Sequence, residues 1–272
     1  TECIVDINYD NAGITVQNGS LMATDAAAHG IEMLYSNSSL TLDRVTVTVP
    51  GKTYGIVTNG LEQKNTVSLQ ESTLNVENGY GIYFPSTGTV SVENSVINAK
   101  YVGVQMCAGT LNVTGERTSI TVTDKESEKT ENDGVIGDGA AISIVERDGY
   151  QDLGSVEIDG GVFKASNSSA AVKAYTFNNT DKTEEPWPTA NEVIAITGGT
   201  FQVVNGDQTE QSDVTNYIPA GILLTQDETG AVIKDTAPVV ATIKDLQFTS
   251  LKAAIDYASA GDTIRIVSTD LQ

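Results

Sequence analysis

The chain has 272 residues, and its 36 acidic residues outnumber its 15 basic ones, which gives a formal net charge of −21 at pH 7. A surplus of this size repels phosphate, and it argues against nucleic acids and anionic membrane surfaces as partners. Apolar residues make up 39% of the chain, which indicates a narrow core, and no apolar run of 18 residues predicts membrane insertion.

A tetrapeptide that begins with glycine or alanine recurs along the chain. The first three intervals between its copies are 25, 26 and 22 residues, and the later ones are 38, 30 and 50 residues because they carry insertions. Regular self-similarity of this kind is typical of repeat architectures. The copies are GIEM (Gly30), GIVT (Gly55), GIYF (Gly81), GVQM (Gly103), AISI (Ala141), AVKA (Ala171) and GILL (Gly221).

Two further segments of alternating apolar residues follow the tetrapeptide in each period. The first set begins at Leu40, Val67, Val90, Leu111, Val156 and Ile194, and the second at Val45, Leu74, Val96, Ile120, Val162 and Phe201. Each period therefore holds three short strands. Since 22 to 26 residues are too few for a meander, we expect each strand to pair with its counterpart one period away. This predicts an all-β fold, a single-stranded parallel β-helix with three sheets around a narrow core.

The alternation also predicts where side chains point. Ile82 and Phe84 fall in inward columns. Tyr80 has the same parity, so we expect it to pack against Tyr54 in the preceding copy. Tyr83 has the opposite parity, and we expect it to face solvent beside Gln105.

Two insertions leave from the same corner of successive periods, at residues 145–154 and 175–191, and we expect them to lie side by side. Insertions gathered on one face of a repeat protein often form its binding face. Trp187 stands between two prolines in the second insertion, and Tyr150, Tyr175 and Phe177 complete a candidate aromatic patch. Such rings bind the C–H faces of sugars. The alternative is that Trp187 covers a hydrophobic shoulder of the core.

A third insertion, residues 124–139, leaves from a different corner and is a candidate calcium site. Glu131, Asp133 and Asp138 lie among glycines there, and calcium prefers oxygen ligands on flexible loops. The spacing is not that of a regular calcium motif, so a solvated acidic loop is the alternative. No other cofactor is predicted.

The remaining chemistry-bearing residues are few. Cys3 and Cys107 are expected to be free thiols, since nothing in the sequence demands a disulfide. His29 is the single histidine, which closes off most histidine-based catalysis, and we expect it to pack or to hydrogen-bond within the fold.

The C-terminal part of the chain departs from the repeat. Residues 221–235 predict a hairpin that turns at 228–230, and residues 248–267 predict a helix followed by a strand. Thr249 or Ser250 caps this helix and Gly261 ends it. Its apolar stripe is formed by Leu251, Ala254, Ile255 and Ala258. We therefore divide the chain into coils at 1–213, a hairpin or cap at 214–240, and a helix–strand segment at 241–272 that either caps this module or begins another.

The repeat resembles the right-handed parallel β-helix family with the pectate-lyase-like fold. It is most similar to repeat modules of secreted or wall-attached surface proteins of Gram-positive bacteria, in which coils like ITGGTF (residues 196–201) and segments like residues 249–267 recur. The resemblance implies right-handed coiling, an adhesin-like role and an extracellular location, secreted or attached to the cell wall.

The sequence favours a non-catalytic module over an enzyme. Polysaccharide lyases of this fold need a cationic base beside carboxylate-bound calcium, yet the chain has only four arginines and no recurring aspartate cluster. We therefore expect a rigid scaffold or adhesin whose loops contact a glycan or a host surface protein, and we name no catalytic residue. The alternative is a polysaccharide lyase or glycoside hydrolase that acts on a complex carbohydrate. The sequence does not set the oligomeric state.

Overall fold

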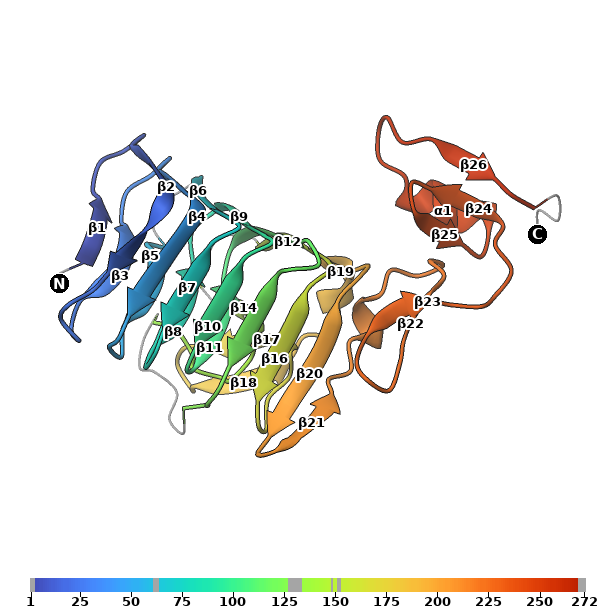
Figure 1. Cartoon of the computed structure of the whole chain (residues 1–272). Helices are drawn as coiled ribbons and strands as arrows, with labels where there is room; N and C mark the ends of the chain where they lie inside the picture. The colour runs from blue at the N-terminus through green and yellow to red at the C-terminus, as the bar shows by residue number, and fades with distance from the viewer. Residues whose placement is uncertain (1–2, 61–63, 127–133, 148, 151–152, 269–272) are drawn as a thin grey trace.

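The computed structural model describes residues 3–60, 64–126, 134–147, 149–150 and 153–268. These residues form an all-β protein in which two large, mostly parallel sheets face each other across one core, with a small separate unit at the C-terminal end (Figure 1). No helix among the described residues is long and apolar enough to cross a membrane.

The eight-stranded sheet is built from the recurring tetrapeptides. Each of its first seven strands pairs in parallel with its counterpart one repeat away, so that Tyr54 lies beside Tyr80 and Ile56 beside Ile82. The predicted pairing across repeats is thereby confirmed for this sheet. In spatial order its strands are β1 (Cys3–Ile7), β3 (His29–Met33), β5 (Tyr54–Thr58), β8 (Tyr80–Phe84), β11 (Val102–Met106), β14 (Ile142–Arg147), β17 (Val172–Asn178) and the antiparallel β18 (Thr183–Pro186).

The thirteen-stranded sheet contains the other two predicted columns. One limb holds β6 (Asn65–Gln70), β9 (Gly88–Glu93), β12 (Gly109–Thr114), β15 (Leu153–Asp159) and β19 (Ile194–Ile196). The other holds β7 (Thr73–Val76), β10 (Val96–Ala99), β13 (Ser119–Val122), β16 (Val162–Ser166), β20 (Thr200–Asn205) and the antiparallel β21 (Gln208–Gln211). Two long strands, β2 (Gly13–Met22) and β4 (Ser39–Val49), run through both limbs.

The second and third columns therefore belong to one sheet, where the sequence predicted two. The reason is a left-handed residue at the corner, which turns the strand without ending its pairing: Arg44 has φ 55° in the middle of β4. The corner is left-handed at Asn18, Glu71, Asn94, Gly115 and Gly160 as well.

Serines fasten these corners from one repeat to the next. The Oγ of Ser72 accepts a hydrogen bond from the backbone N of Val45 at 3.0 Å, and the Oγ of Ser95 accepts one from the backbone N of Ser72, also at 3.0 Å. Each serine also donates to a carbonyl two residues earlier in its own chain. Backbone groups that the turn removes from the ladder are thus satisfied.

The core lies between the two sheets. Ile82 and Phe84 are fully buried in it, as predicted, and the rings of Phe163 and Phe201 stack with centroids 4.8 Å apart. At the C-terminal end of the stack the core is covered, because Trp187, Tyr217 and Val232 pack against it. Two short 3₁₀ helices, η1 (Ala190–Glu192) and η2 (Thr215–Tyr217), carry part of this cover.

The C-terminal part contains the predicted hairpin, β22 (Leu224–Gln226) and β23 (Val232–Lys234). It continues into a three-stranded sheet with one helix and a small core of its own, which includes Phe248 and Ala254. These elements are β24 (Ala241–Ile243), β25 (Leu246–Phe248), α1 (Leu251–Tyr257) and β26 (Ile264–Ile266), and we call them the C-terminal unit.

The helix prediction is right at its start and wrong at its end. The Oγ of Ser250 accepts a hydrogen bond from the backbone N of Ala253 at 3.0 Å, which is the predicted cap. The helix stops at Tyr257, well before Gly261, because Ala258 is already extended. Ile255 is 55% exposed, so it does not belong to the buried stripe.

Candidate functional site

The third insertion is described at residues 124–126 and 134–139, and residues 134–139 lie across the outer face of the eight-stranded sheet. Gln105 binds it in both directions: its Nε2 donates to the carbonyl of Ile136 and its Oε1 accepts from the backbone N of Ile136, each at 2.9 Å. The backbone N of Gly139 donates to the carbonyl of Tyr101 at 2.8 Å. We call this covered surface, with the residues of β8, β11, β14 and β17 beneath the insertion, the insertion face.

The cover corrects two predictions of exposure. Tyr83 and Gln105 do point away from the main core, but they are 5% and 0% exposed. Tyr80 is buried and lies 5.5 Å from the Tyr54 ring, as predicted, yet it packs in the outer cluster with Tyr83 and not in the main core. The spacing of apolar residues does not show which path an insertion takes over the surface. The sequence therefore did not predict that the insertion covers this face of the sheet.

Asp138 is the most heavily bonded carboxylate of the insertion face. It is 2% exposed, and it accepts hydrogen bonds from Ser143 Oγ at 2.6 Å, from the Tyr175 hydroxyl at 2.9 Å and from the backbone N of Ala140 at 3.0 Å. Burial raises the pKa of the Asp138 carboxyl, and the charge of Lys173 and these hydrogen bonds only partly oppose it. Burial, and then the nearby Asp138, also raise the pKa of Tyr175, so its hydroxyl stays a donor.

Arg147 joins all three insertions. Its Nη1 donates to the carbonyl of Gly134 at 2.6 Å, and its Nε and Nη2 donate to Asn179 Oδ1 at 3.1 and 2.8 Å. Its guanidinium carbon lies 5.1 Å from the centre of the Phe177 ring and 5.5 Å from that of Tyr150. The insertions at 145–154 and 175–191 are therefore neighbours, as predicted, and the third meets them at the same arginine.

The sequence did not single out Arg147 in this role. The available signal was its parity in β14, where it falls on the same outward face as Ser143 and Val145. The insertion at 145–154 starts from this strand, and the insertion at 124–139 comes just before it in the chain. An arginine on the outward face of β14 can therefore bind both neighbouring insertions.

A buried thiol and two phenols complete the insertion face. The hydroxyls of Tyr83 and Tyr150 are 3.1 Å apart. Burial raises the pKa of Cys107 to about 12, although the charge of Arg147 opposes this shift, so the thiol is inert at neutral pH. Cys3 and Cys107 are both free, as predicted.

The structure separates the four rings of the predicted aromatic patch. Tyr150, Tyr175 and Phe177 share the outer cluster, whereas Trp187 packs against the main core. Tyr175 and Phe177 are 3% and 2% exposed, so neither ring offers a face to solvent. Tyr150 and Trp187 are the two that remain partly exposed.

Of the three predicted calcium ligands, only Asp138 lies within the described residues. Glu131 and Asp133 lie outside the described residues, and the Asp138 carboxylate is occupied by protein donors. Among the described residues, no group of three or more histidine, cysteine, aspartate or glutamate side chains is placed to hold a metal ion.

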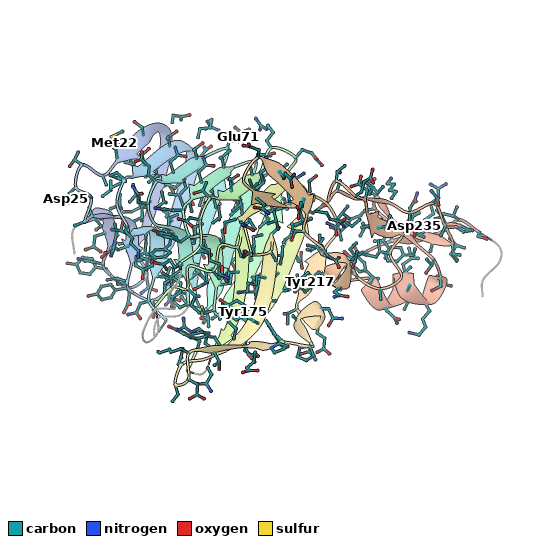
Figure 2. All side chains as sticks on the ribbon, turned by 90° about the horizontal axis from the view of Figure 1, so that it is seen from below. Met22, Asp25, Glu71, Tyr175, Tyr217 and Asp235 are labelled. Atoms are coloured by element: carbon teal, nitrogen blue, oxygen red, sulfur yellow. The ribbon has the colours of Figure 1, made fainter. Side chains whose placement is uncertain are left out.

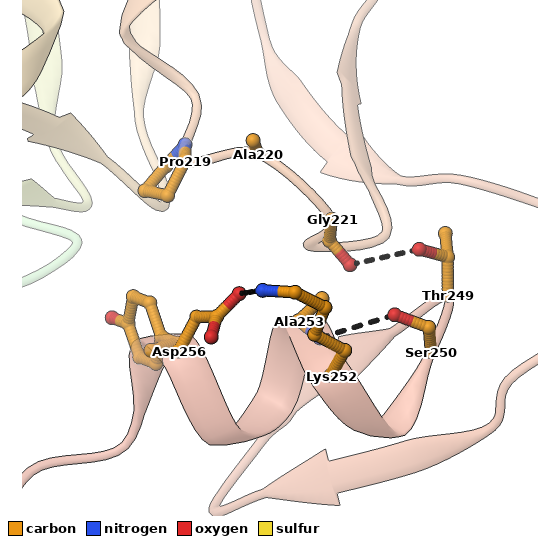
Figure 3. Close-up of a pocket in the computed structure, with 9 residues that line it drawn as sticks. Pro219, Ala220, Gly221, Thr249, Ser250, Lys252, Ala253 and Asp256 are labelled. Atoms are coloured by element: carbon orange, nitrogen blue, oxygen red, sulfur yellow. Dashed lines mark hydrogen bonds and ion pairs between the residues drawn. The ribbon is translucent and has the colours of Figure 1, made fainter.

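A shallow hollow lies elsewhere, between residues 219–221 and α1 (Figure 3). Its polar groups bind one another: Lys252 pairs with Asp256, and the Thr249 hydroxyl donates to the carbonyl of Gly221 at 3.4 Å. The hollow therefore offers a ligand few polar groups that are not already engaged.

The insertion face ties three insertions to one sheet through groups that bond to each other. Within the described residues, the functional groups of this face contact other groups of the same chain. These contacts hold the insertions in place on the sheet. No family model matches the chain, and no curated protein or solved structure matches it.

Proposed function

We propose that the chain is a non-catalytic, rigid scaffold module of a secreted or cell-wall-attached protein, built as a right-handed single-stranded parallel β-helix. The observation that carries the proposal is the parallel, in-register pairing of strands from repeat to repeat in both sheets, which shifts register between β12 and β15 at Gly109–Leu111. Six strand steps separate β1 from β17, and at about 4.8 Å a step the stack is about 29 Å long in that sheet.

The outer surface of the thirteen-stranded sheet supports a scaffold role. Ser68, Ser91 and Asn112 stand in register on adjacent strands, with Thr66, Thr89 and Thr110 in a parallel row. These short neutral side chains form a flat surface, whereas hydrolysis of a glycosidic bond needs two placed carboxylates about 5 to 10 Å apart in a site. Polysaccharide lyase or glycoside hydrolase activity is the competing function.

In this proposal the insertions are the contact surface for a glycan or a host surface protein. Trp187 and Tyr150 are the rings that retain an exposed part, and both are held by the fold, which lowers the entropy lost on binding. An aromatic ring held in this way suits the apolar face of a sugar.

A glycan array with the wild type, Trp187→Ala and Tyr35→Ala tests the contact role. Tyr35 is 43% exposed and lies far from the insertions in sequence, so it is the matched control. Binding that is lost in Trp187→Ala and kept in Tyr35→Ala supports the proposal, provided that Trp187→Ala melts well above the temperature of the assay and is therefore still folded. If the wild-type protein binds no glycan and no host surface protein, the contact role is refuted and only the role of a rigid scaffold remains.

The scaffold role has its own test. Incubation with uronate-containing and neutral polysaccharides should release neither reducing ends nor unsaturated products. Turnover that survives purification, and that disappears when a carboxylate of the chain is replaced, would contradict a non-catalytic module.

A further inference from the structure

The C-terminal unit is joined to the stack through the hairpin of β22 and β23, which lies between them (Figure 1). Figure 2 shows the same order, with Tyr217 at the end of the stack and Asp235 toward the C-terminal unit. We call β22, β23 and their turn the junction hairpin. Two units of one chain usually move relative to each other unless a substantial contact prevents it. The contacts of the junction hairpin therefore decide whether the C-terminal unit moves or is fixed.

The backbone of the junction hairpin is bonded to the last coil of the stack. The backbone N of Val232 donates to the carbonyl of Gly199 at 2.8 Å, and the backbone N of Phe201 donates to the carbonyl of Gly230 at 2.9 Å. The approach is close, because a Cβ at Gly230 would lie 2.1 Å from the backbone oxygen of Phe201. The side chain of Val232 packs against the main core. The hairpin is thus held by backbone hydrogen bonds and by apolar packing together.

Gln226 fastens the junction hairpin a second time, through both ends of its side-chain amide. Its Oε1 accepts from the backbone N of Val214 at 3.0 Å, and its Nε2 donates to the carbonyls of Ser212 at 2.8 Å and Gly230 at 3.0 Å. The Oγ of Ser212 in turn accepts from the backbone N of Ala171 at 2.9 Å, just before β17. A hydrogen-bonded path therefore runs from the eight-stranded sheet through Ser212 and Gln226 to the hairpin.

The other side of the junction hairpin passes directly into the sheet of the C-terminal unit. The backbone N of Leu223 donates to the carbonyl of Gln247 in β25 at 2.7 Å, and β22 begins at the next residue. Ile222 forms an antiparallel bridge with Phe248, and its side chain belongs to the small core of the unit. The backbone N of Asp235 donates to the carbonyl of Leu223 at 3.0 Å. No residue separates the pairing with β25 from the start of the hairpin.

We propose that the junction hairpin is a rigid coupling that fixes the orientation of the C-terminal unit relative to the stack, with Gln226 and Val232 as the side chains that hold it. A rotation of the unit has to break backbone hydrogen bonds and expose apolar side chains. The proposal rests on the scaffold role put forward above and extends it from the stack to the C-terminal unit. A partner that contacts both the unit and the insertion face then meets two surfaces at a fixed distance, which raises the effective concentration of the second contact.

Pulsed electron paramagnetic resonance between two spin labels tests the coupling. In a Cys3→Ser background the buried Cys107 stays unlabelled. Thr48→Cys with Lys252→Cys gives a distance across the junction, since Lys252 lies exposed on α1. Thr48→Cys with Lys164→Cys gives a distance within the stack, where four strand steps separate the register positions by about 19 Å. The distance distribution across the junction should be as narrow as the one within the stack.

A pair of matched double variants tests the residues that hold the coupling. Gln226→Ala with Val232→Asp removes the side-chain contacts between the junction hairpin and the stack. It should broaden the distribution across the junction and leave the one within the stack unchanged. Gln208→Ala with Ile233→Asp makes the same changes at exposed positions of β21 and β23, and it should alter neither distribution.

The outcomes separate the coupling from the scaffold. The coupling is overturned if the wild-type distribution is broader across the junction than within the stack, or if Gln226→Ala with Val232→Asp keeps the narrow distribution; either result leaves the rigid stack in place. A broad distribution within the stack would instead contradict the scaffold role. Circular dichroism of each variant shows whether the strands are retained, and the wild-type comparison decides for or against the coupling even where a double variant does not fold.

Discussion

Replacing Gly81 with alanine perturbs a close approach between successive repeats. A Cβ at Gly81 would lie 2.1 Å from the backbone oxygen of Gly103 and 3.0 Å from Cγ2 of Ile97. The first contact is with backbone of the next strand, so the two coils have to separate locally. Gly30, Gly55 and Gly103 meet the following repeat in the same way. The recurring glycine of the tetrapeptide is thus explained by the packing of one repeat on the next.

The expected cost is that of overpacking a filled core, about 1–3 kcal/mol. For a chain of this size 1 kcal/mol lowers the melting temperature by about 2–4 °C, so a mid-range loss of about 2 kcal/mol corresponds to roughly 4–8 °C. Thermal and urea unfolding, each followed by the circular dichroism signal of the β-strands, measure both quantities.

Gly19→Ala is the matched control. Gly19 also lies in a strand, β2, but a Cβ there meets nothing within 4 Å. Its replacement should leave stability unchanged or raise it by about 0.4–1 kcal/mol, because alanine restricts the unfolded chain. If Gly81→Ala and Gly19→Ala unfold with the same free energy within about 0.5 kcal/mol, the close contact between repeats is refuted.

Three further predictions concern the insertion face. Burial raises the pKa of the Asp138 carboxyl above the usual value of about 3.9, so its contribution to stability is present below about pH 3.9 and is lost as the pH rises through the raised pKa. The stability of the wild type relative to Asp138→Asn should therefore fall with rising pH. A relative stability that rises with pH would contradict this prediction. Arg147→Ala should lower the free energy of unfolding by about 1.5–3 kcal/mol and speed hydrogen exchange in residues 134–139. Replacement of the exposed Arg117 with alanine should cost less than about 1 kcal/mol. Equal losses in the two variants would argue against the role of Arg147 in joining the insertions. A thiol reagent at pH 8 should modify Cys3 alone in the native chain and both cysteines after unfolding, since burial raises the pKa of Cys107 to about 12; rapid native labelling of Cys107 would show that the face is open.

The strand columns were predictable because they depend on local alternation. Ile82 and Phe84 enter the core from a strand whose parity is visible in the sequence, and their counterparts repeat at nearly constant intervals. The corners were harder to predict, since the alternation of apolar residues breaks at Arg44 while β4 continues through this left-handed residue. The sequence therefore predicted the three columns of strands, but it did not predict that the second and third columns form one continuous sheet.

The candidate site depended on long-range contacts that no spacing encodes. Tyr83 has the parity of a surface residue, and it is buried because Tyr150 and residues 134–139 pack over this face of the sheet. Arg147 binds Gly134 and Asn179 across two insertions, which the sequence places 13 residues before it and 32 residues after it. In the same way, Ile255 has the spacing of a core residue, but it is 55% exposed within α1, where Ala254 is the buried residue.

The central claim is that each strand lies beside its counterpart one repeat away, and a disulfide test measures it most directly. Ser68 and Ser91 are register partners on adjacent strands, so their Cα atoms lie about 4.8 Å apart, within the range of a disulfide. Ser68 and Asn112 are two strands apart, at about 9.6 Å, which is too far. In a Cys3→Ser background the account predicts that Ser68→Cys with Ser91→Cys oxidises readily in the native state and that Ser68→Cys with Asn112→Cys does not. Equal oxidation of the two pairs, or none in the first, would contradict it.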